Sequence, residues 1–578
     1  MDRQITSRPQ GHNLTNTGVW SPDSNWIVYD TRFGEAGSLF DGSTIEAINV
    51  HTGEVRRLYE SLQGAHCGVA TFHPREWKVV FILGPENPTP DWQYSFSHRQ
   101  GVMVDWEKPG IAVNLDARDL IPPFTPGALR GGSHVHVWDA TGDWVSFTYN
   151  DALLESELRD IGVSIPGHPV RVPAENIRNH SSDFFAAIVS RTTANPQPGS
   201  DEIKRACEEA WVGTNGYVRT NGIRQSRALA FQGTVVKTNG ESISEVFIVD
   251  LPEDLRQAGD GPLAGMIADR PSPPNGVKQR RLTFTADRRF PGIQGPRHWL
   301  RSSPDGSRIA FLMKDDEGIV QLWTVVPKDD SVSQLTHNPW DIASAFTWSP
   351  DGSNLAHIMD NSVFLTDAAT GDCQRVTSRV SDETRPRPEA CVFSPDGSKI
   401  AFMRKHSIDG VVSNHVCVVF LKAQGQVQGT LADIKTPNID ALARSGVLTK
   451  HGYSTAPQCV PSRAGLLVGK FQGRFNLDSN GGSLEGFDQE TTIASRLQKV
   501  GYVTAQFGKW HLGPTTAIPT HGFKHVFAQN AQSPFSANIT LDGQDRAMGN
   551  LPPELYHVDA CSRAATAVIE RYQNDPFC

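Results

Sequence analysis

Long hydrophobic runs, paired cysteines and an excess of positive charge are all missing from this 578-residue sequence. Because no run of about 18 consecutive apolar residues occurs, we expect no membrane-spanning helix. The eight cysteines are scattered without a Cys-x-x-Cys pair, which indicates reduced thiols rather than a disulfide framework. The N-terminal sequence MDRQITSRPQGHNLTN is polar and lacks the apolar core of a signal peptide. These features together predict a cytoplasmic protein.

The charge balance is mildly acidic, with 54 Lys and Arg against 63 Asp and Glu and a formal net charge of -9. Proteins that bind nucleic acid nonspecifically carry a basic surface, so we expect no nucleic-acid partner. Apolar residues make up 38% of the chain, which is too many for a disordered protein. The 51 Gly and 38 Pro, together with 13 Trp, favour a turn-rich β protein.

One turn motif recurs along the first 420 residues. Three nearly identical copies, SPDGSRIAFLMK, SPDGSNLAHIMD and SPDGSKIAFMRK, begin at Ser303, Ser349 and Ser394. Looser copies begin at Trp20, Phe72 and Trp138, and a degenerate copy lies around Gln225. In each copy Pro-Asp-Gly sets a tight turn, which a short strand such as 308–311 and a second strand such as 319–324 follow.

Repeats of about 45 residues that hold several strands each are typical of β-propeller blades. A β-sandwich with recurring turns is the alternative, but sandwiches do not repeat one turn sequence. We therefore predict a mainly β fold, with a propeller of six blades, or seven if the degenerate copy forms one, over residues 1–420. The S-P-D-G-S-x-I-A-F signature resembles that of TolB-like and WD40-type propellers, in particular an uncharacterised bacterial TolB-like family. That resemblance implies a platform that binds a protein or a small molecule, and it says little else about function.

The pattern changes after Gln424 from repeated strands to helices that alternate with strands. A helix is predicted after Thr436-Pro437 with Gly446 as its stop, and others are predicted over TTIASRLQKVG and CSRAATAVIERYQ. The segment 502–507 reads as a strand between them. This alternation predicts an α/β layer domain over residues 426–578.

Three motifs of this second domain resemble those of the sulfatase family. Cys459 opens the sequence CVPSRA, Gly508 opens GKWHLG, and Ile434 opens IKTPNID. The three stand in the family order, which chance rarely produces. The resemblance implies a partial α/β/α fold of the alkaline-phosphatase type and a sulfuric ester hydrolase.

The same resemblance implies a mechanism and a role for each site residue. A maturation enzyme would oxidise Cys459 to formylglycine, whose hydrated aldehyde attacks the sulfur of a sulfate ester, releases the alcohol and then expels sulfate. The start of a helix at this cysteine would aim backbone N–H groups at the sulfate. Arg463 would pair with the nucleophile, Lys509 would contact the nucleophile and the substrate sulfate, and His511 would orient or deprotonate the nucleophile. Lys509 and His511 share one face if the preceding strand extends that far.

Sulfatases also bind a divalent cation, usually calcium, through two adjacent Asp after their first strand and through later residues. No acid occurs between Asp409 and Asp433, and the sequence ends at Cys578 where the family continues to further ligands. Because calcium prefers six to eight oxygen ligands, we assign no metal ligand and expect calcium binding to be impaired. Two functions stay open: a sulfatase with weakened or lost activity, and a non-enzymatic propeller module that carries a vestigial sulfatase segment.

A His-x-His pair, His134 and His136, lies in a predicted propeller strand. Alternation along a strand would put both side chains on one face, where they could hold a metal or a polar ligand in the channel. The alternative is a pair of hydrogen-bonded structural histidines. No G-x-S-x-G motif occurs, which argues against a propeller joined to an α/β-hydrolase peptidase.

Overall fold

The computed structural model describes residues 2–33, 39–154, 158–408, 410–421, 439, 442, 445–446, 454–529, 536–541, 544–550 and 555–576. The chain divides into two compact units, Met1–Gln424 and Gly425–Cys578. Each unit has its own hydrophobic cores.

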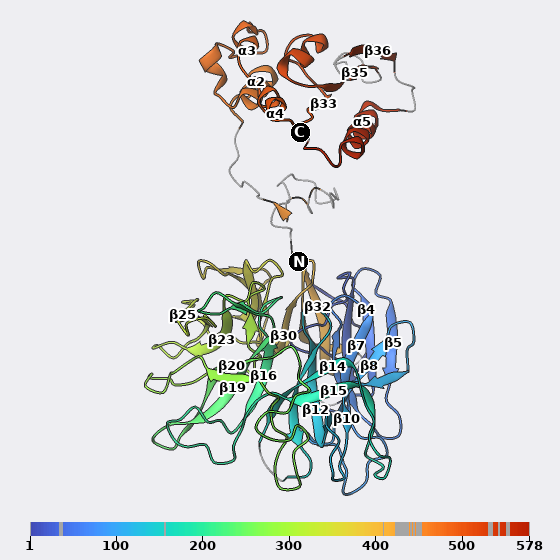
Figure 1. Ribbon diagram of the computed structural model, residues 1–578, viewed down its shortest axis with the longest axis vertical. Helices are drawn as coiled ribbons and strands as arrows, with labels where there is room; N and C mark the ends of the chain where they lie inside the picture. The colour runs from blue at the N-terminus through green and yellow to red at the C-terminus, as the bar shows by residue number, and fades with distance from the viewer. Residues whose placement is uncertain are drawn as a thin grey trace. The chain divides into compact units, whose positions relative to one another are not determined.

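The first unit is a ring of seven antiparallel four-stranded sheets, the blades of a β-propeller (Figure 1). Blade 1 holds β2 (Gly11–Asn13), β3 (Trp26–Arg32), β4 (Thr44–Asn49) and β5 (Val55–Glu60). Blade 2 holds β6 (Cys67–Phe72), β7 (Lys78–Leu83), β8 (Gln100–Asp105) and β9 (Ala112–Asn114). Blade 3 holds β12 (Gly131–Trp138), β13 (Val145–Asp151), β14 (Asp160–Val170) and β15 (Ser182–Ile188). Blade 4 holds β16 (Ala206–Trp211), β19 (Ala228–Val236), β20 (Ser242–Asp250) and β21 (Lys278–Arg281).

The remaining three blades contain the clearest copies of the turn motif. Blade 5 holds β22 (Arg301–Ser302), β23 (Ile309–Lys314), β24 (Val320–Val325) and β25 (Val332–Gln334). Blade 6 holds β26 (Thr347–Trp348), β27 (Asn354–Met359), β28 (Ser362–Asp367) and β29 (Cys373–Arg375). Blade 7 holds β30 (Pro386–Phe393), β31 (Lys399–Ile408), β32 (Val411–Phe420) and β1 (Asp2–Gln4). Two short pairs, β10–β11 (Ala117–Arg118 with Ala128–Leu129) and β17–β18 (Tyr217–Val218 with Arg224–Gln225), lie in connections.

The degenerate repeat around Gln225 is blade 4, so the propeller has seven blades. Its second strand, β19, begins at Ala228, and the β17–β18 hairpin is inserted before it. That insertion replaces the short Pro-Asp-Gly turn, which explains why this copy is hard to recognise in the sequence.

The ring is closed by a strand from the other end of the unit. β1 pairs with β32 in antiparallel register, with Asp2 opposite Val419 and Gln4 opposite Cys417. Trp20 of blade 1 donates an indole N–H to the carbonyl of Val392 in blade 7, 3.0 Å away, within a shared buried cluster. The segment 418–420 is therefore part of a propeller blade.

The recurring turn has the same hydrogen bonds in blades 5, 6 and 7. Ser303, Ser349 and Ser394 each donate an Oγ–H to the Asp two residues later at 2.5 Å. Burial acts to raise the pKa of these carboxyl groups, but the serine hydrogen bonds outweigh it and hold each pKa below its ordinary value. The motif is thus a built turn that joins the innermost strand of each blade to the second strand.

The second unit is part of an α/β/α layer fold. β33 (Ala505–Gly508) pairs in parallel with β34 (His525–Gln529), and β35 (Ser536–Leu541) and β36 (Gln544–Asn550) extend the sheet antiparallel. α2 (Cys459–Val468), α3 (Glu485–Asp488) and α4 (Ile493–Lys499) contribute to one core, together with the turns η3 (Gln472–Phe475) and η4 (Thr515–His521). α5 (His557–Arg571) contacts β33 and β34 through a separate cluster. A third turn, η2 (Asp382–Thr384), belongs to the propeller.

Most of the elements predicted for this unit are confirmed, with shifted ends. The TTIASRLQKVG helix is α4, capped by Thr492, whose Oγ1 accepts a hydrogen bond from Ser495 N at 3.1 Å. The predicted strand 502–507 is β33, displaced toward Gly508. The helix predicted after Thr436-Pro437 lies outside the described residues. None of the described helices combines the length and the apolarity that crossing a membrane requires.

Replacing Asp351 with Ala should destabilise the propeller by about 1–2 kcal/mol, because three hydrogen bonds end on this carboxylate. They come from Ser349 Oγ, Ser353 N and Ser353 Oγ. Urea unfolding of the full chain measures the change. The matched control is Asp91→Ala, at an exposed position, which should unfold like the original protein. Equal stability of the two variants would contradict the proposed role of the turn.

Candidate functional site

Cys459 is the first residue of α2, and its side chain is exposed. Gln458 occupies the N-cap position without a capping hydrogen bond from its side chain. Val460 N donates to Asn480 Oδ1 at 3.0 Å, and Asn480 N donates to Gln458 Oε1 at 2.7 Å. The cysteine thus lies at the positive end of a helix whose first turn is held by a distant loop.

Asn480 is a site residue that sequence reasoning missed. It lies in the sequence SNGG, which reads only as a turn, so no local signal could identify it. The structure also corrects the expectation that this helix start presents several free N–H groups. The N–H of Val460 is taken by Asn480, and Pro461 has none, so attraction of an anion depends mainly on side chains.

Arg463 joins the two signature motifs. Its Nε–H donates to the carbonyl of Trp510 at 2.8 Å, and its Nη2 donates to the carbonyl of Lys509. Burial lowers the pKa of this guanidinium, while the nearby Cys459 acts to raise it. Three of the four predicted site residues, Cys459, Arg463 and Lys509, are therefore brought to one place.

Lys509 and His511 are both exposed, whereas Trp510 and Leu512 between and after them are buried. Trp510 contacts the rings of Phe487 and Phe523 in the core of the unit. Lys509 and His511 would share one face of a strand that continued through them. The strand does not continue, because β33 ends at Gly508 and His511 has a φ of +59°. Burial of Trp510, rather than strand alternation, turns the two polar side chains outward.

The described part of the chain does not fit the calcium of the sulfatases. Within it, no group of three or more His, Cys, Asp or Glu side chains lies close enough to hold a metal ion. Calcium needs several oxygen ligands, so no step of a reaction is derived through it. Cys459 does fit the formylglycine precursor, because its thiol is exposed at the start of a helix.

The side chains of His134 and His136 do not lie on one face of β12 as the sequence predicts. A β-bulge shifts the register of β12 between His134 and Val137, and Val135 adopts a φ of +59°. The bulge interrupts the alternation, so the His134 ring lies near Phe96 and the His136 ring near Phe147. His136 Nε2 lies 3.0 Å from Ser133 Oγ, and the Nδ1 atoms of both buried rings have no hydrogen-bond partner.

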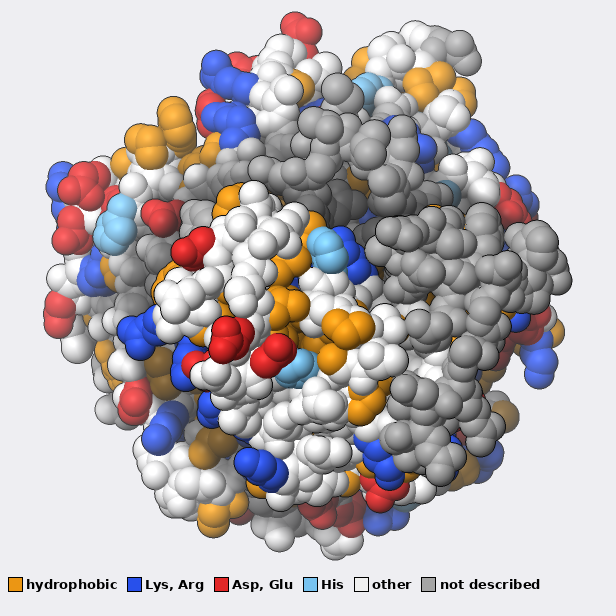
Figure 2. All heavy atoms as spheres, turned by 90° about the horizontal axis from the view of Figure 1, so that it is seen from above, with side chains coloured by type: hydrophobic (Ala, Val, Ile, Leu, Met, Phe, Trp, Pro, Cys, Tyr) orange, Lys and Arg blue, Asp and Glu red, His pale blue; other side chains and the backbone are white. Residues whose placement is uncertain are grey.

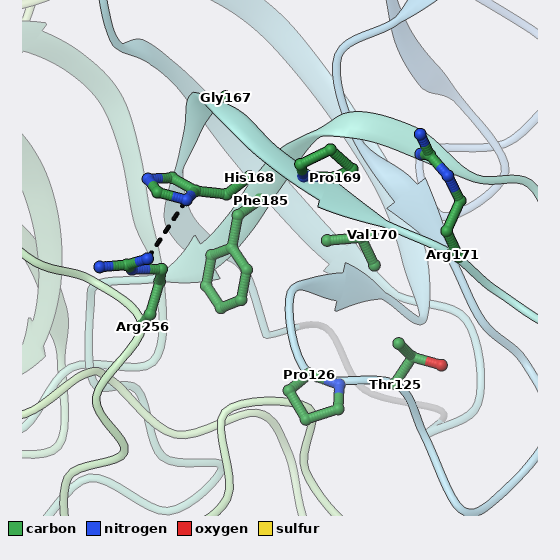
Figure 3. A pocket seen from close by; sticks show the side chains of 9 residues that line it. All are labelled: Thr125, Pro126, Gly167, His168, Pro169, Val170, Arg171, Phe185 and Arg256. Carbon is green, nitrogen blue, oxygen red and sulfur yellow. Dashed lines mark hydrogen bonds between the residues drawn. The ribbon is translucent and has the colours of Figure 1, made fainter.

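A hollow of about 420 Å³ opens on blade 3 (Figure 3). Arg256 Nη1 lies 3.2 Å from His168 Nδ1 across it, and the same guanidinium pairs with Asp254. Arg171, on its rim, pairs with Asp183. Because both cations already have carboxylate partners, this hollow offers no unmatched charge to a ligand.

Positive and negative side chains are interspersed on the face that Figure 2 presents, with hydrophobic side chains between them.

Comparison with known proteins places both parts of the chain. Residues 421–573 match the Sulfatase family model. Residues 66–180 match a protein of unknown function (DUF3748), and residues 321–409 match the dipeptidyl peptidase IV (DPP IV) N-terminal region. The human Arylsulfatase D is 37% identical over 149 residues, which cover 23% of this chain and 23% of the relative. TolB from Acinetobacter baumannii is 12% identical with a TM-score of 0.28, over 68% of this chain and 80% of that structure.

The seven blades and the residues around Cys459 define a β-propeller protein with a sulfatase domain at its C-terminal end. The uncharacterized protein YidR of Escherichia coli (strain K12) is 48% identical over 410 residues, which cover 69% of this chain and 94% of that relative. The chain belongs to the YidR family.

Among the cysteines that the structure describes, Cys459 should be the first to react with a brief dose of iodoacetamide, because its thiol is exposed while burial raises the pKa of Cys67 and of Cys417 to about 12. A thiol that stays protonated and buried reacts slowly. Mass spectrometry of tryptic peptides after short labelling measures the order. Labelling of Cys417 as fast as that of Cys459 would contradict the exposed position.

Proposed function

We propose that the Gly425–Cys578 unit binds sulfate esters and hydrolyses them through Cys459, after this residue is converted to formylglycine by a maturation enzyme. The observation that carries the proposal is the hydrogen bonding of Arg463 to the backbone of Lys509 and Trp510. It joins two sulfatase motifs, about 50 residues apart in the chain, at the N-terminus of α2.

Each residue of the site has a task that its environment supports. Formylglycine at position 459 supplies the hydrated aldehyde that acts as the nucleophile. The positive end of α2 adds a smaller attraction for negative charge, because the N–H of Val460 is taken by Asn480. Lys509 is exposed and can attract the sulfate group, and His511, two residues on, can accept a proton from the nucleophile. Arg463 acts as a positioning residue that holds the Lys509 segment against the helix.

Hydrolysis of an aryl sulfate tests the proposal directly. The full chain is co-expressed with a formylglycine-generating enzyme, and release of 4-nitrophenol from 4-nitrophenyl sulfate is followed with calcium and with a chelator. We expect turnover that falls to the uncatalysed rate in Cys459→Ala, since the nucleophile is then absent. The matched control is Cys561→Ala, a half-buried cysteine of the same unit, which should keep the activity.

Mass spectrometry of the peptide that contains residue 459 separates maturation from catalysis. If Cys459 is converted to the aldehyde and no aryl sulfate is hydrolysed, the proposal that this unit is an enzyme is wrong. An unmodified thiol without turnover would also overturn it for this chain and leave the propeller as the functional part.

Lys509→Ala should raise KM for the aryl sulfate about tenfold or more, because a charge-assisted contact to the substrate anion is lost. Lys524→Ala is the matched control, since Lys524 is an exposed lysine of the same unit away from the signature motifs. Steady-state kinetics of the matured enzyme measure both. An equal KM for the two variants would contradict the proposed contact between Lys509 and the substrate sulfate.

A further inference from the structure

Two arginines of the propeller, Arg99 and Arg159, lie against the ring of Phe96. The guanidinium carbon of Arg99 lies 4.6 Å from the ring centre, and that of Arg159 lies 5.1 Å from it. The ring of His134 is 5.9 Å from the same centre. Arg99 precedes β8 and Arg159 precedes β14, so connections of two neighbouring blades bring these cations to the innermost strand β12.

Arg297 completes the group from the connection that enters β22. It is close enough to act electrostatically on Arg99, Arg159 and His134. Its Nε lies 2.9 Å from Glu208 Oε1, while its side chain is 63% exposed. We call Arg99, Arg159, Arg297 and His134 the arginine cluster.

The positive charge of the arginine cluster is not balanced by the described residues. Arg297 pairs with Glu208, but neither Arg99 nor Arg159 forms an ion pair in the described part of the chain. Burial first, and then the neighbouring arginines, hold the pKa of His134 well below its usual value, so the ring is neutral. Among the described residues, three guanidiniums against one carboxylate leave a surplus of two positive charges.

Several polar atoms of the cluster are also unused. The Nε atoms of Arg99 and Arg159 and the Nδ1 atom of His134 are buried and have no hydrogen-bond partner. Leaving such a group buried without a partner is costly, and holding like charges together adds to that cost. A ligand that accepts these hydrogen bonds and carries negative charge would remove both costs.

The backbone is shaped so that the cluster can form. A Cβ atom on Gly132 would lie 2.3 Å from Phe96 O and 2.9 Å from Arg99 N. Glycine at this position therefore lets the segment that carries Phe96 and Arg99 pass directly over β12. Phe96 itself is 53% exposed, which leaves the site open to solvent on one side.

We propose that the arginine cluster binds a small dianion, such as a phosphate monoester or a dicarboxylate, whose carbon skeleton lies against Phe96. The charge of the ligand matches the surplus of two positive charges, and guanidinium groups pair with carboxylate or phosphate oxygens through two parallel hydrogen bonds. The site uses propeller residues alone, so it does not depend on the chemistry of Cys459.

Isothermal titration of the full chain tests this site with two probes, inorganic phosphate and malonate, at about pH 8 and constant ionic strength. We expect saturable binding of one equivalent per chain. Binding should weaken about tenfold or more in Arg159→Gln and in Arg297→Gln, because each removes a charged donor. The matched control is Arg256→Gln in the blade 3 hollow, which should bind like the original protein, as should Cys459→Ala.

The outcomes separate the two sources of the dianion. Binding of phosphate alone supports a phosphorylated ligand, binding of malonate alone supports a dicarboxylate, and binding of both supports the shared chemistry. The proposal is overturned if neither probe shows saturable binding, or if Arg297→Gln binds as tightly as Arg256→Gln. Because the Arg297 side chain is mostly exposed, Arg297→Gln should fold. Its affinity for the two probes therefore tests the proposal even if Arg159→Gln fails to fold.

Discussion

The antiparallel pairing of Asp2–Gln4 with Val411–Phe420 is the contact on which the propeller depends. Blades are joined in sequence along one chain, so the ring closes only when its first and last segments meet in one sheet. Because of this pairing, β32, the strand directly before residue 421, is part of the propeller. The sulfatase match begins directly after it, so the end of one fold and the start of the other meet within a few residues.

Arg463 of the sulfatase unit and the propeller pair Arg99 and Arg159 differ in how their donors are used. In the sulfatase unit, Arg463 gives its hydrogen bonds to backbone carbonyls and so fixes the position of a neighbouring segment. In the propeller, the Nε atoms of Arg99 and Arg159 are buried without a partner. A guanidinium whose donors are satisfied stabilises the fold, whereas one whose donors are buried and unused is costly until a ligand arrives. The difference points to a structural role in one unit and to a binding role in the other.

Alternation along a strand failed as a guide at two places, for a common physical reason. Val135 and His511 both adopt a φ near +59°, a conformation that an extended strand does not contain. At Val135 the result is a bulge that separates His134 from His136, and at His511 the strand has already ended. The bending residue itself is neither glycine nor asparagine at either place. The nearby glycines, Gly131 and Gly132 before Val135 and Gly508 and Gly513 around His511, do not mark which residue bends.

The sequence by itself determined the repeating turn, the propeller class, most helices of the second unit and the sulfatase motifs, because these depend on contacts between residues near in the chain. Only the tertiary structure decided that blade 4 completes a ring of seven, that Asn480 holds the first turn of α2 and that Arg463 reaches the carbonyl of Trp510. It alone brings Arg99, Arg159 and Arg297 together. These residues come from separate blades. A periodic sequence pattern predicts the strands of each blade, but it does not predict which side chains of different blades become neighbours when the ring closes.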